Sequence, residues 1–176
     1  MEICKRLSYT LEDYIAFNFF YLKKRLIWMP VLLVVLFPAM MAGVSLINGD
    51  SSWFVMLIVT GLIGILMAGL MTLVNVLAVR SAAKKQYRSS KAMQSESELI
   101  MDEAGVRESS EYGSTVVRWE DVLDIRESAT AYYVFFSRIQ ALLIPKRSLS
   151  PAEEDTLRAL CAHHLQPAKL RLRDRK

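Results

Sequence analysis

The sequence predicts an α+β membrane protein, in which an N-terminal transmembrane helical hairpin precedes a small cytoplasmic antiparallel β domain closed by a C-terminal helix. Three observations lead to this prediction. Two long apolar runs without a charged residue occupy the first half of the chain. Short alternating segments separated by turn residues follow them, and an amphipathic segment with a strong helix start signal comes after these strands.

The two apolar runs cover residues 26–47 and 53–79, and residues 48–52 connect them. Each run is longer than the roughly 20 residues that cross the hydrocarbon core of a bilayer as a helix. A cleaved signal peptide explains them poorly, because the cations at 23–25 lie far from the start and a second run follows the first. We therefore expect two membrane spans. The lipid bilayer is then one expected partner of the protein.

Basic residues on both sides of the hairpin predict its orientation. The connecting loop carries no basic residue and one aspartate, Asp50. Cytoplasmic flanks are enriched in lysine and arginine, so both termini are expected in the cytoplasm, as in a two-span protein of the cell membrane. The cations before the hairpin are Lys5, Arg6, Lys23, Lys24 and Arg25, and those after it are Arg80, Lys84, Lys85, Arg88 and Lys91.

Residues 1–25 are predicted to form a short strand over 3–9 and then a helix that leads into the first span. Thr10 and Asp13 have the spacing of a helix capping box. The aromatic residues of this helix are spread around its circumference, which suits a position at the level of the lipid headgroups or packing against the soluble domain. The pattern does not distinguish the two. These residues are Tyr14, Phe17, Phe19, Phe20 and Tyr21.

A stripe of small and polar residues is predicted on one face of the second span, at spacings of three and four. Small side chains let two helices approach closely, and the amide of Asn75 needs a hydrogen-bond partner in hydrocarbon. The stripe is expected to pack against the first span, where Pro38 is expected to kink the helix; self-association of two chains is the alternative. We call these residues the small-residue stripe: Gly61, Gly64, Ala68, Thr72 and Asn75.

Residues 80–94 are expected to continue the second helix into the cytoplasm and to end in a short linker. Lys84, Lys85 and Arg88 are candidate contacts for anionic lipid headgroups there. Residues 166–176 form a basic tail that is a second candidate for such contacts. The tail cations are Lys169, Arg171, Arg173, Arg175 and Lys176.

Residues 95–165 are predicted to form the soluble domain. Ser150-Pro151-Ala152-Glu153 is typical of a helix start, and the helix is expected to run to about Leu165 with Leu157, Leu160 and Cys161 facing inward. About six antiparallel strands precede it, so the helix would cover an open end of a small sandwich or barrel. The expected strands lie at 98–101, 106–110, 115–119, 122–127, 131–136 and 139–144.

The charge distribution argues against nucleic acid as a partner. Although the formal net charge is +4, residues 95–165 contain thirteen acidic and seven basic side chains. A nucleic-acid-binding face would need a basic surface, and the basic residues belong to the membrane flanks and the tail instead.

Candidate catalytic and metal-binding patterns are weak. Cys161-Ala162-His163-His164 offers fewer ligands than a structural zinc site needs, so neither a metal nor a cofactor is expected. Ser81 and Lys84 have the Ser-x-x-Lys spacing of some acyl-transferring enzymes, but no second motif accompanies them. Neither histidine lies in a triad context, so no catalytic residue is assigned and no enzyme is expected.

Five short segments have a characteristic order around the hairpin: 9–14, 119–122, 127–128, 132–135 and 141–147. Together they resemble the bacterial YcxB-like family, and we expect the protein in the inner membrane. The resemblance covers nearly the whole chain and implies a soluble domain similar to pleckstrin-homology (PH) folds; it implies no activity. In PH domains a basic loop between the first two strands often binds phosphoinositides, and the loop at 102–105 carries no cation.

The expected function is that of a non-catalytic, membrane-anchored interaction module that presents the PH-like domain to a protein or peptide partner. Lys146 and Arg147, after the last strand, are candidate contacts for a partner or for lipid, or else part of a solvated turn. Two other functions stay open. In the first, the protein senses anionic lipid or has a structural role in the membrane. In the second, it is an immunity factor against a membrane-active toxin.

Overall fold

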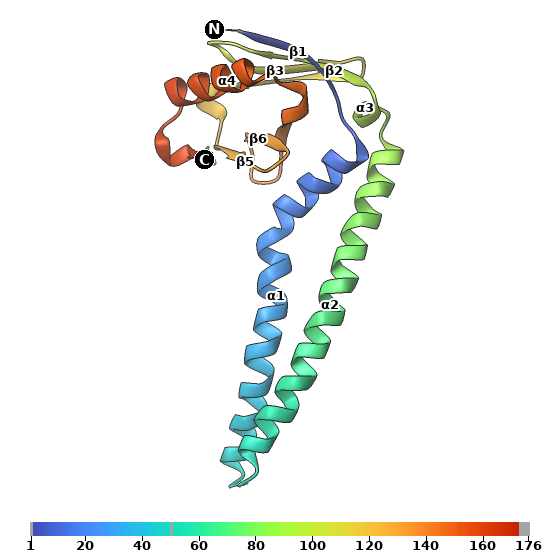
Figure 1. The fold of residues 1–176 in the computed structure, drawn as a ribbon, viewed down its shortest axis with the longest axis vertical. Helices are drawn as coiled ribbons and strands as arrows, with labels where there is room; N and C mark the ends of the chain where they lie inside the picture. The colour runs from blue at the N-terminus through green and yellow to red at the C-terminus, as the bar shows by residue number, and fades with distance from the viewer. Residues whose placement is uncertain (1, 50, 173–176) are drawn as a thin grey trace. The chain divides into compact units, whose positions relative to one another are not determined.

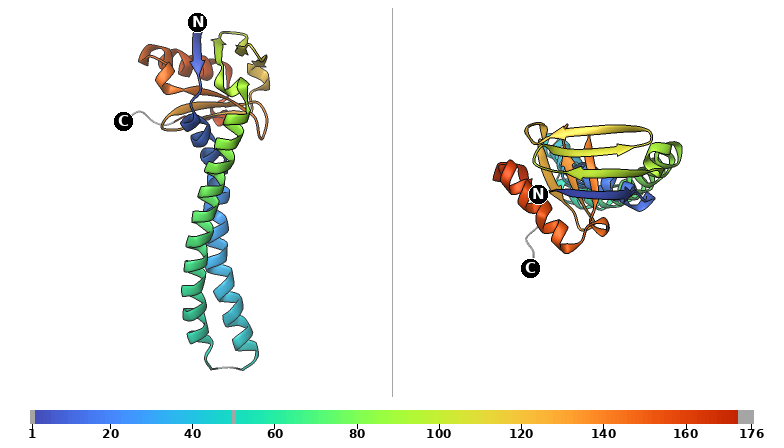
Figure 2. Two further views of the ribbon diagram at one scale, coloured as in Figure 1. Left: turned by 90° about the vertical axis from the view of Figure 1, so that its right-hand side faces the viewer. Right: turned by 90° about the horizontal axis from the view of Figure 1, so that it is seen from above.

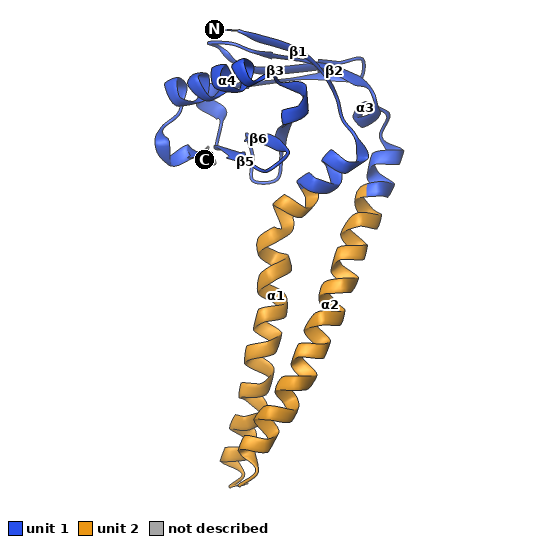
Figure 3. Ribbon diagram, in the orientation of Figure 1, with its two compact units in different colours: residues 1–17, 84–176 blue, residues 18–83 orange. Residues whose placement is uncertain are grey.

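The computed structural model describes residues 2–49 and 51–172 and divides into two compact units. Unit 1 comprises Met1–Phe17 and Lys84–Lys176, and unit 2 comprises Asn18–Ala83 (Figure 3). The expected α+β organisation is confirmed: two long apolar helices are followed by mostly antiparallel strands and then by a helix (Figure 1).

Unit 2 (Asn18–Ala83) contains helix α1 (Leu11–Ile47) from Asn18 to its end and helix α2 (Trp53–Ser89) from its start to Ala83. Both helices are long and apolar enough to cross a membrane. Many of their large apolar side chains are exposed; Leu62 is 60% exposed and Leu66 is 74% exposed. Core helices of soluble proteins bury such residues, so these surfaces are suited to hydrocarbon rather than to water.

Unit 1 contains two four-stranded sheets. The first sheet is antiparallel and runs β1-β2-β3-β4 side by side (Figure 2, right). The second sheet runs β7-β6-β5-β8, and only the β5–β8 pair is parallel. The strands are β1 (Ile3–Ser8), β2 (Glu96–Met101), β3 (Gly105–Ser110), β4 (Gly113–Arg118), β5 (Asp124–Glu127), β6 (Ala131–Phe135), β7 (Ala141–Pro145) and β8 (Leu170–Arg171). The helices are α3 (Lys91–Gln94), α4 (Pro151–His164) and the 3-10 turns η1 (Trp119–Asp121), η2 (Lys146–Ser148) and η3 (Pro167–Lys169).

The strand expected near the N-terminus exists, and it belongs to the first sheet of unit 1. β1 pairs with β2 along its whole length, from Ile3 opposite Met101 to Ser8 opposite Glu96. The sequence pattern predicts a separate segment over residues 1–25, whereas the structure pairs its strand with β2. The pairing is favourable because it satisfies the backbone groups of β2 on that side, while Ile3 and Leu7 enter the core.

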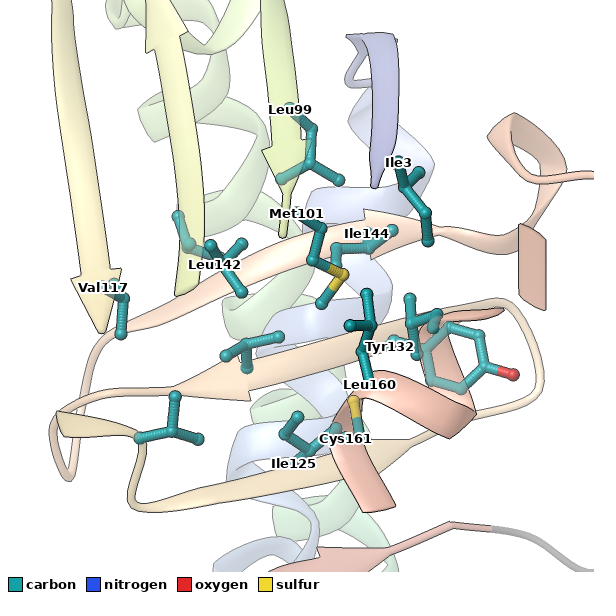
Figure 4. Close-up of a cluster of buried hydrophobic side chains, with 14 of the residues drawn as sticks. Ile3, Leu99, Met101, Val117, Ile125, Tyr132, Leu142, Ile144, Leu160 and Cys161 are labelled. Carbon is teal, nitrogen blue, oxygen red and sulfur yellow. The ribbon is translucent and has the colours of Figure 1, made fainter. Parts of the chain in front are cut away.

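The core of unit 1 lies between the two sheets and α4 (Figure 4). The inward-facing side chains of successive strands alternate with outward-facing ones, as in β2, where Leu99 and Met101 are 1% and 0% exposed. Every residue of β6 is buried. Tyr132 and Val134 belong to the core, and on the other face the ring centroid of Phe17 lies 5.4 Å from that of Tyr133. At Phe17, therefore, the first turns of α1 pack against β6 within unit 1.

Helix α4 confirms the predicted start signal. The Ser150 hydroxyl accepts a hydrogen bond from the Glu153 amide, and the Glu153 carboxylate accepts one from the Ser150 amide, which together form a capping box. Leu157, Leu160 and Cys161 are buried, as expected. The helix thereby closes the core next to η1 and the turn between β2 and β3.

Candidate functional site

A cavity of about 520 Å³ lies within unit 1, and six of the residues that line it are aromatic. Four separate segments contribute to it: the chain after β1, the end of α2 with α3, the β3–β4 hairpin and the β6–β7 hairpin. We call it the tyrosine cavity. Its aromatic residues are Tyr9, Tyr14, Phe17, Tyr87, Tyr112 and Phe136.

One carboxylate, that of Glu108, lies among the described residues that line the tyrosine cavity, and no Lys, Arg or His side chain does. The Tyr9 hydroxyl donates a hydrogen bond to Glu108 Oε1 at 2.7 Å and also lies 3.1 Å from the carbonyl oxygen of Leu143. Burial, followed by the negative charge of Glu108, raises the pKa of Tyr9. Tyr9 therefore stays a neutral donor that holds the Glu108 carboxylate at the wall.

The register of the sheets explains why these groups meet. Glu108 lies opposite Leu99 of β2 on one side and Thr115 of β4 on the other. β1 ends one residue before Tyr9, and the Tyr87 hydroxyl donates a hydrogen bond to the Tyr9 carbonyl at 2.8 Å. The end of α2 is thus attached to the chain segment that carries Tyr9. Polar groups with an aromatic wall are typical of pockets that orient a bound group.

Lys146 and Arg147, which the sequence marked as candidate ligand contacts, are held by carboxylates of the same chain. Lys146 Nζ forms an ion pair with Glu127, and Arg147 Nη1 forms one with Asp13. Arg147 Nη2 also donates to the carbonyl of Ser8 at 2.6 Å. Burial opposes ionisation of Asp13, but the hydrogen bonds from Arg147 and Thr10 outweigh it, so the pKa of Asp13 is lowered.

The other candidate cations lie at the end of α2 and in the tail. Lys84, Lys85 and Arg88 are exposed on the last turns of α2. In the tail, Lys169 Nζ donates to the Val122 carbonyl at 2.8 Å, and Arg171 Nε lies 3.8 Å from an Asp124 oxygen. The remaining tail cations, Arg173, Arg175 and Lys176, lie outside the described residues.

The members of the small-residue stripe are not all buried. Gly64 and Ala68 are buried, Gly61 and Asn75 are half-buried, and Thr72 is exposed. A Cβ atom at Gly64 would lie 3.7 Å from Val34 Cα, so α1 and α2 approach closely at this point. Thr60, which the prediction did not include, is buried four residues before Gly64. The Asn75 amide donates to the Met71 carbonyl at 2.9 Å, within its own helix.

Sequence reasoning missed the tyrosine cavity, because its walls come from residues between 9 and 143 and no local pattern joins them. It also missed the position of Glu103, which the structure brings beside His163 and His164, where the three side chains have ligand atoms close enough to hold a metal ion. Adjacent histidines were visible in the sequence. Their acidic neighbour lies about 60 residues away, and only the fold brings it close.

Comparison with known proteins identifies one part of the chain. Residues 102–161 match the family described as YcxB-like protein. The match begins in the turn after β2 and ends within α4, and it agrees with the resemblance drawn from the sequence. No curated protein and no solved structure matches the chain.

Proposed function

We propose that this chain, whose residues 102–161 match the YcxB-like family, is a two-span protein of the cell membrane that binds a protein or peptide at its cytoplasmic face without catalysing a reaction. The observation that carries the proposal is the tyrosine cavity. The fold of unit 1, with two sheets and a C-terminal helix against the core, supports a PH-like domain. The link from such a fold to recognition is an analogy; the chemistry of the cavity makes it specific.

The proposed orientation has both termini in the cytoplasm, and it predicts the labelling of single cysteines. In a Cys4→Ser background, Ser51→Cys lies in the connecting loop and should react with a membrane-impermeant maleimide while the membrane is intact. Ser114→Cys, on the exposed strand β4, is the matched control and should react only after lysis. Cys161 is buried and contributes little background. Labelling of Ser114→Cys in intact cells, without labelling of Ser51→Cys, would contradict the proposed orientation and indicate the opposite one.

The tyrosine cavity is suited to a basic side chain of a partner that also offers apolar groups. A lysine or arginine entering it would meet the Glu108 carboxylate, and aromatic faces attract cations by about 0.5–2 kcal/mol. A lipid phosphate would instead meet a negative charge with no cation among the described lining residues. We therefore place the basic residue on the partner peptide.

Crosslinking in native membranes tests this proposal. Tyr112 is 52% exposed at the rim, so a photoreactive benzoyl-phenylalanine at this position should form an adduct with a polypeptide. Glu108→Gln keeps an acceptor for Tyr9 but removes the charge, and it should lower the adduct yield about tenfold or more, as loss of a desolvated charge pair does. Glu111→Gln removes an exposed charge next to the probe but outside the cavity lining, and it should leave the yield unchanged.

The same experiment contains the outcomes that would contradict the proposal. An adduct with the mass of a lipid would favour the lipid-sensing alternative, in which Lys84, Lys85 and Arg88 contact anionic headgroups. Equal losses of adduct yield in Glu108→Gln and Glu111→Gln would mean that the overall negative charge of the surface attracts the partner. The tyrosine cavity would then not be the binding site. A probe without any adduct would remove the case for a partner at this site.

A further inference from the structure

Two imidazoles at the end of α4 and one carboxylate in the turn between β2 and β3 converge at the surface of unit 1. His164 Nε2 lies 2.9 Å from Glu103 Oε2 and 3.4 Å from His163 Nδ1. One ligand atom from each of the three side chains lies within 4.8 Å of the other two. We propose that Glu103, His163 and His164 bind a divalent transition-metal ion of the zinc class.

The separations between these atoms fit tetrahedral coordination. Metal–nitrogen and metal–oxygen distances near 2.1 Å place neighbouring ligand atoms about 3.4 Å apart around a tetrahedral zinc ion. The separation of 3.4 Å between His163 Nδ1 and His164 Nε2 equals this value, and the separation of 2.9 Å between His164 Nε2 and Glu103 Oε2 is shorter by about 0.5 Å. Glu103 and His163 are exposed, so small rotations of their side chains are enough to open a position for the ion.

Trp119 holds two parts of the proposed metal site in position. Its ring is stacked on that of His164, with centroids 5.2 Å apart and planes 4° from parallel. Its indole Nε1 donates a hydrogen bond to the carbonyl of Asp102 at 2.9 Å, which fixes the residue next to Glu103. Trp119 is itself 6% exposed. One buried side chain therefore positions both the helix end and the turn, and this preparation lowers the entropic cost of binding.

The ligand types select the class of ion. Two imidazole nitrogens and one carboxylate suit Zn²⁺, Ni²⁺, Co²⁺ or Cu²⁺, whereas Mg²⁺ and Ca²⁺ prefer oxygen ligands alone. Three protein ligands leave a coordination position for water. The neighbouring thiol of Cys161 is not a ligand, because it is fully buried in the core and does not belong to the cluster of ligand atoms. The third ligand beside the two histidines is therefore Glu103 and not this cysteine.

The bound ion would join the end of α4 to the β2–β3 turn, and so it would stabilise unit 1 by binding the folded state. This proposal is independent of the tyrosine cavity, none of whose described lining residues belongs to the metal site. Failure at one site therefore leaves the other untouched.

Calorimetric titration of the full chain in detergent tests the site. The Cys4→Ser background removes an exposed thiol that would itself bind zinc. After treatment with a chelator, this protein should take up one equivalent of Zn²⁺ or Ni²⁺ and no Mg²⁺, and zinc should raise its thermal unfolding midpoint. His163→Ala and Glu103→Gln should each weaken zinc binding at least about tenfold, the size of effect seen when groups around a metal are lost.

Controls separate the proposed site from general metal binding. Glu120→Gln removes an exposed carboxylate from the adjacent turn η1 and should bind zinc as the parent does. With Cu²⁺, the electron paramagnetic resonance spectrum should show two coupled nitrogens in the parent and one in His163→Ala. Absence of zinc binding would overturn the proposal, as would zinc uptake and a copper spectrum that His163→Ala and Glu103→Gln leave unchanged.

Discussion

Replacing Gly105 by alanine is expected to remove about 3–5 kcal/mol from the free energy of unfolding of unit 1, at the upper end of single-residue effects. Gly105 has φ +153°, and a Cβ atom there would lie 2.2 Å from the Val117 carbonyl oxygen and 2.9 Å from Arg118 Cα. Both contacts are with backbone of β4, the strand that pairs with β3. The clash therefore cannot be relieved by a side-chain rotation, and the hairpin must open.

Gly113→Ala is the matched control for this prediction. Gly113 has a similar φ of +157°, but nothing lies within 4 Å of the position that its Cβ would occupy. It should show only the cost of the backbone conformation, about 1–3 kcal/mol. Denaturant unfolding of the detergent-solubilised chain, followed by amide hydrogen exchange of β3 and β4, measures both variants. If Gly105→Ala unfolded no more easily than Gly113→Ala, the close approach to Val117 would not limit stability.

Replacing Glu127 by alanine is expected to cost about 3 kcal/mol, because it leaves two partly buried cations without their shared carboxylate. The side chain of Glu127 is 2% exposed and forms ion pairs with Lys146 and with Arg158, whose Nη2 lies 2.6 Å from Oε2. The side chains of these cations are 24% and 21% exposed. Because water partly solvates both cations, the expected loss of stability lies at the lower end of the range for buried ion pairs.

Glu120→Ala is the control for Glu127→Ala. The Glu120–Arg118 pair has both side chains more than 70% exposed, so its loss should change stability by less than about 0.5 kcal/mol. A double-mutant cycle with Arg158→Ala should show coupling between Glu127 and Arg158 and none between Glu120 and Arg158. Equal effects of the two glutamate substitutions would mean that burial of Glu127 does not govern its contribution.

Much of the fold could be read from local patterns. The two apolar helices follow from composition, because a run of uncharged residues of that length has few other stable environments. The start of α4 follows from Ser150 and Glu153, which satisfy each other's orphan backbone groups within one turn. The strands of the domain follow from alternation and turn residues, and the structure places them within a few residues of their expected bounds.

The candidate sites could not be read in this way. Lys146 and Arg147 looked available for a ligand because their carboxylate partners lie 19 and 134 residues away in the chain. The small-residue stripe was drawn from spacing alone, and the contact with α1 left Thr72 on the outside while it buried Thr60. Spacing indicates which residues share a face, but the partner helix decides which part of that face is covered.

The sequence by itself determined that two helices are long and apolar enough to cross a membrane and set the type of each main element, because composition, alternation and capping act over a few residues. The tertiary structure alone decided that β1 joins the sheet across the hairpin, that Glu127 and Asp13 take the cations after β7, and that Glu103 meets the two histidines. Such contacts depend on sheet register and packing between distant segments. A side chain's inward direction is a local property, whereas the identity of its partner is a property of the whole fold.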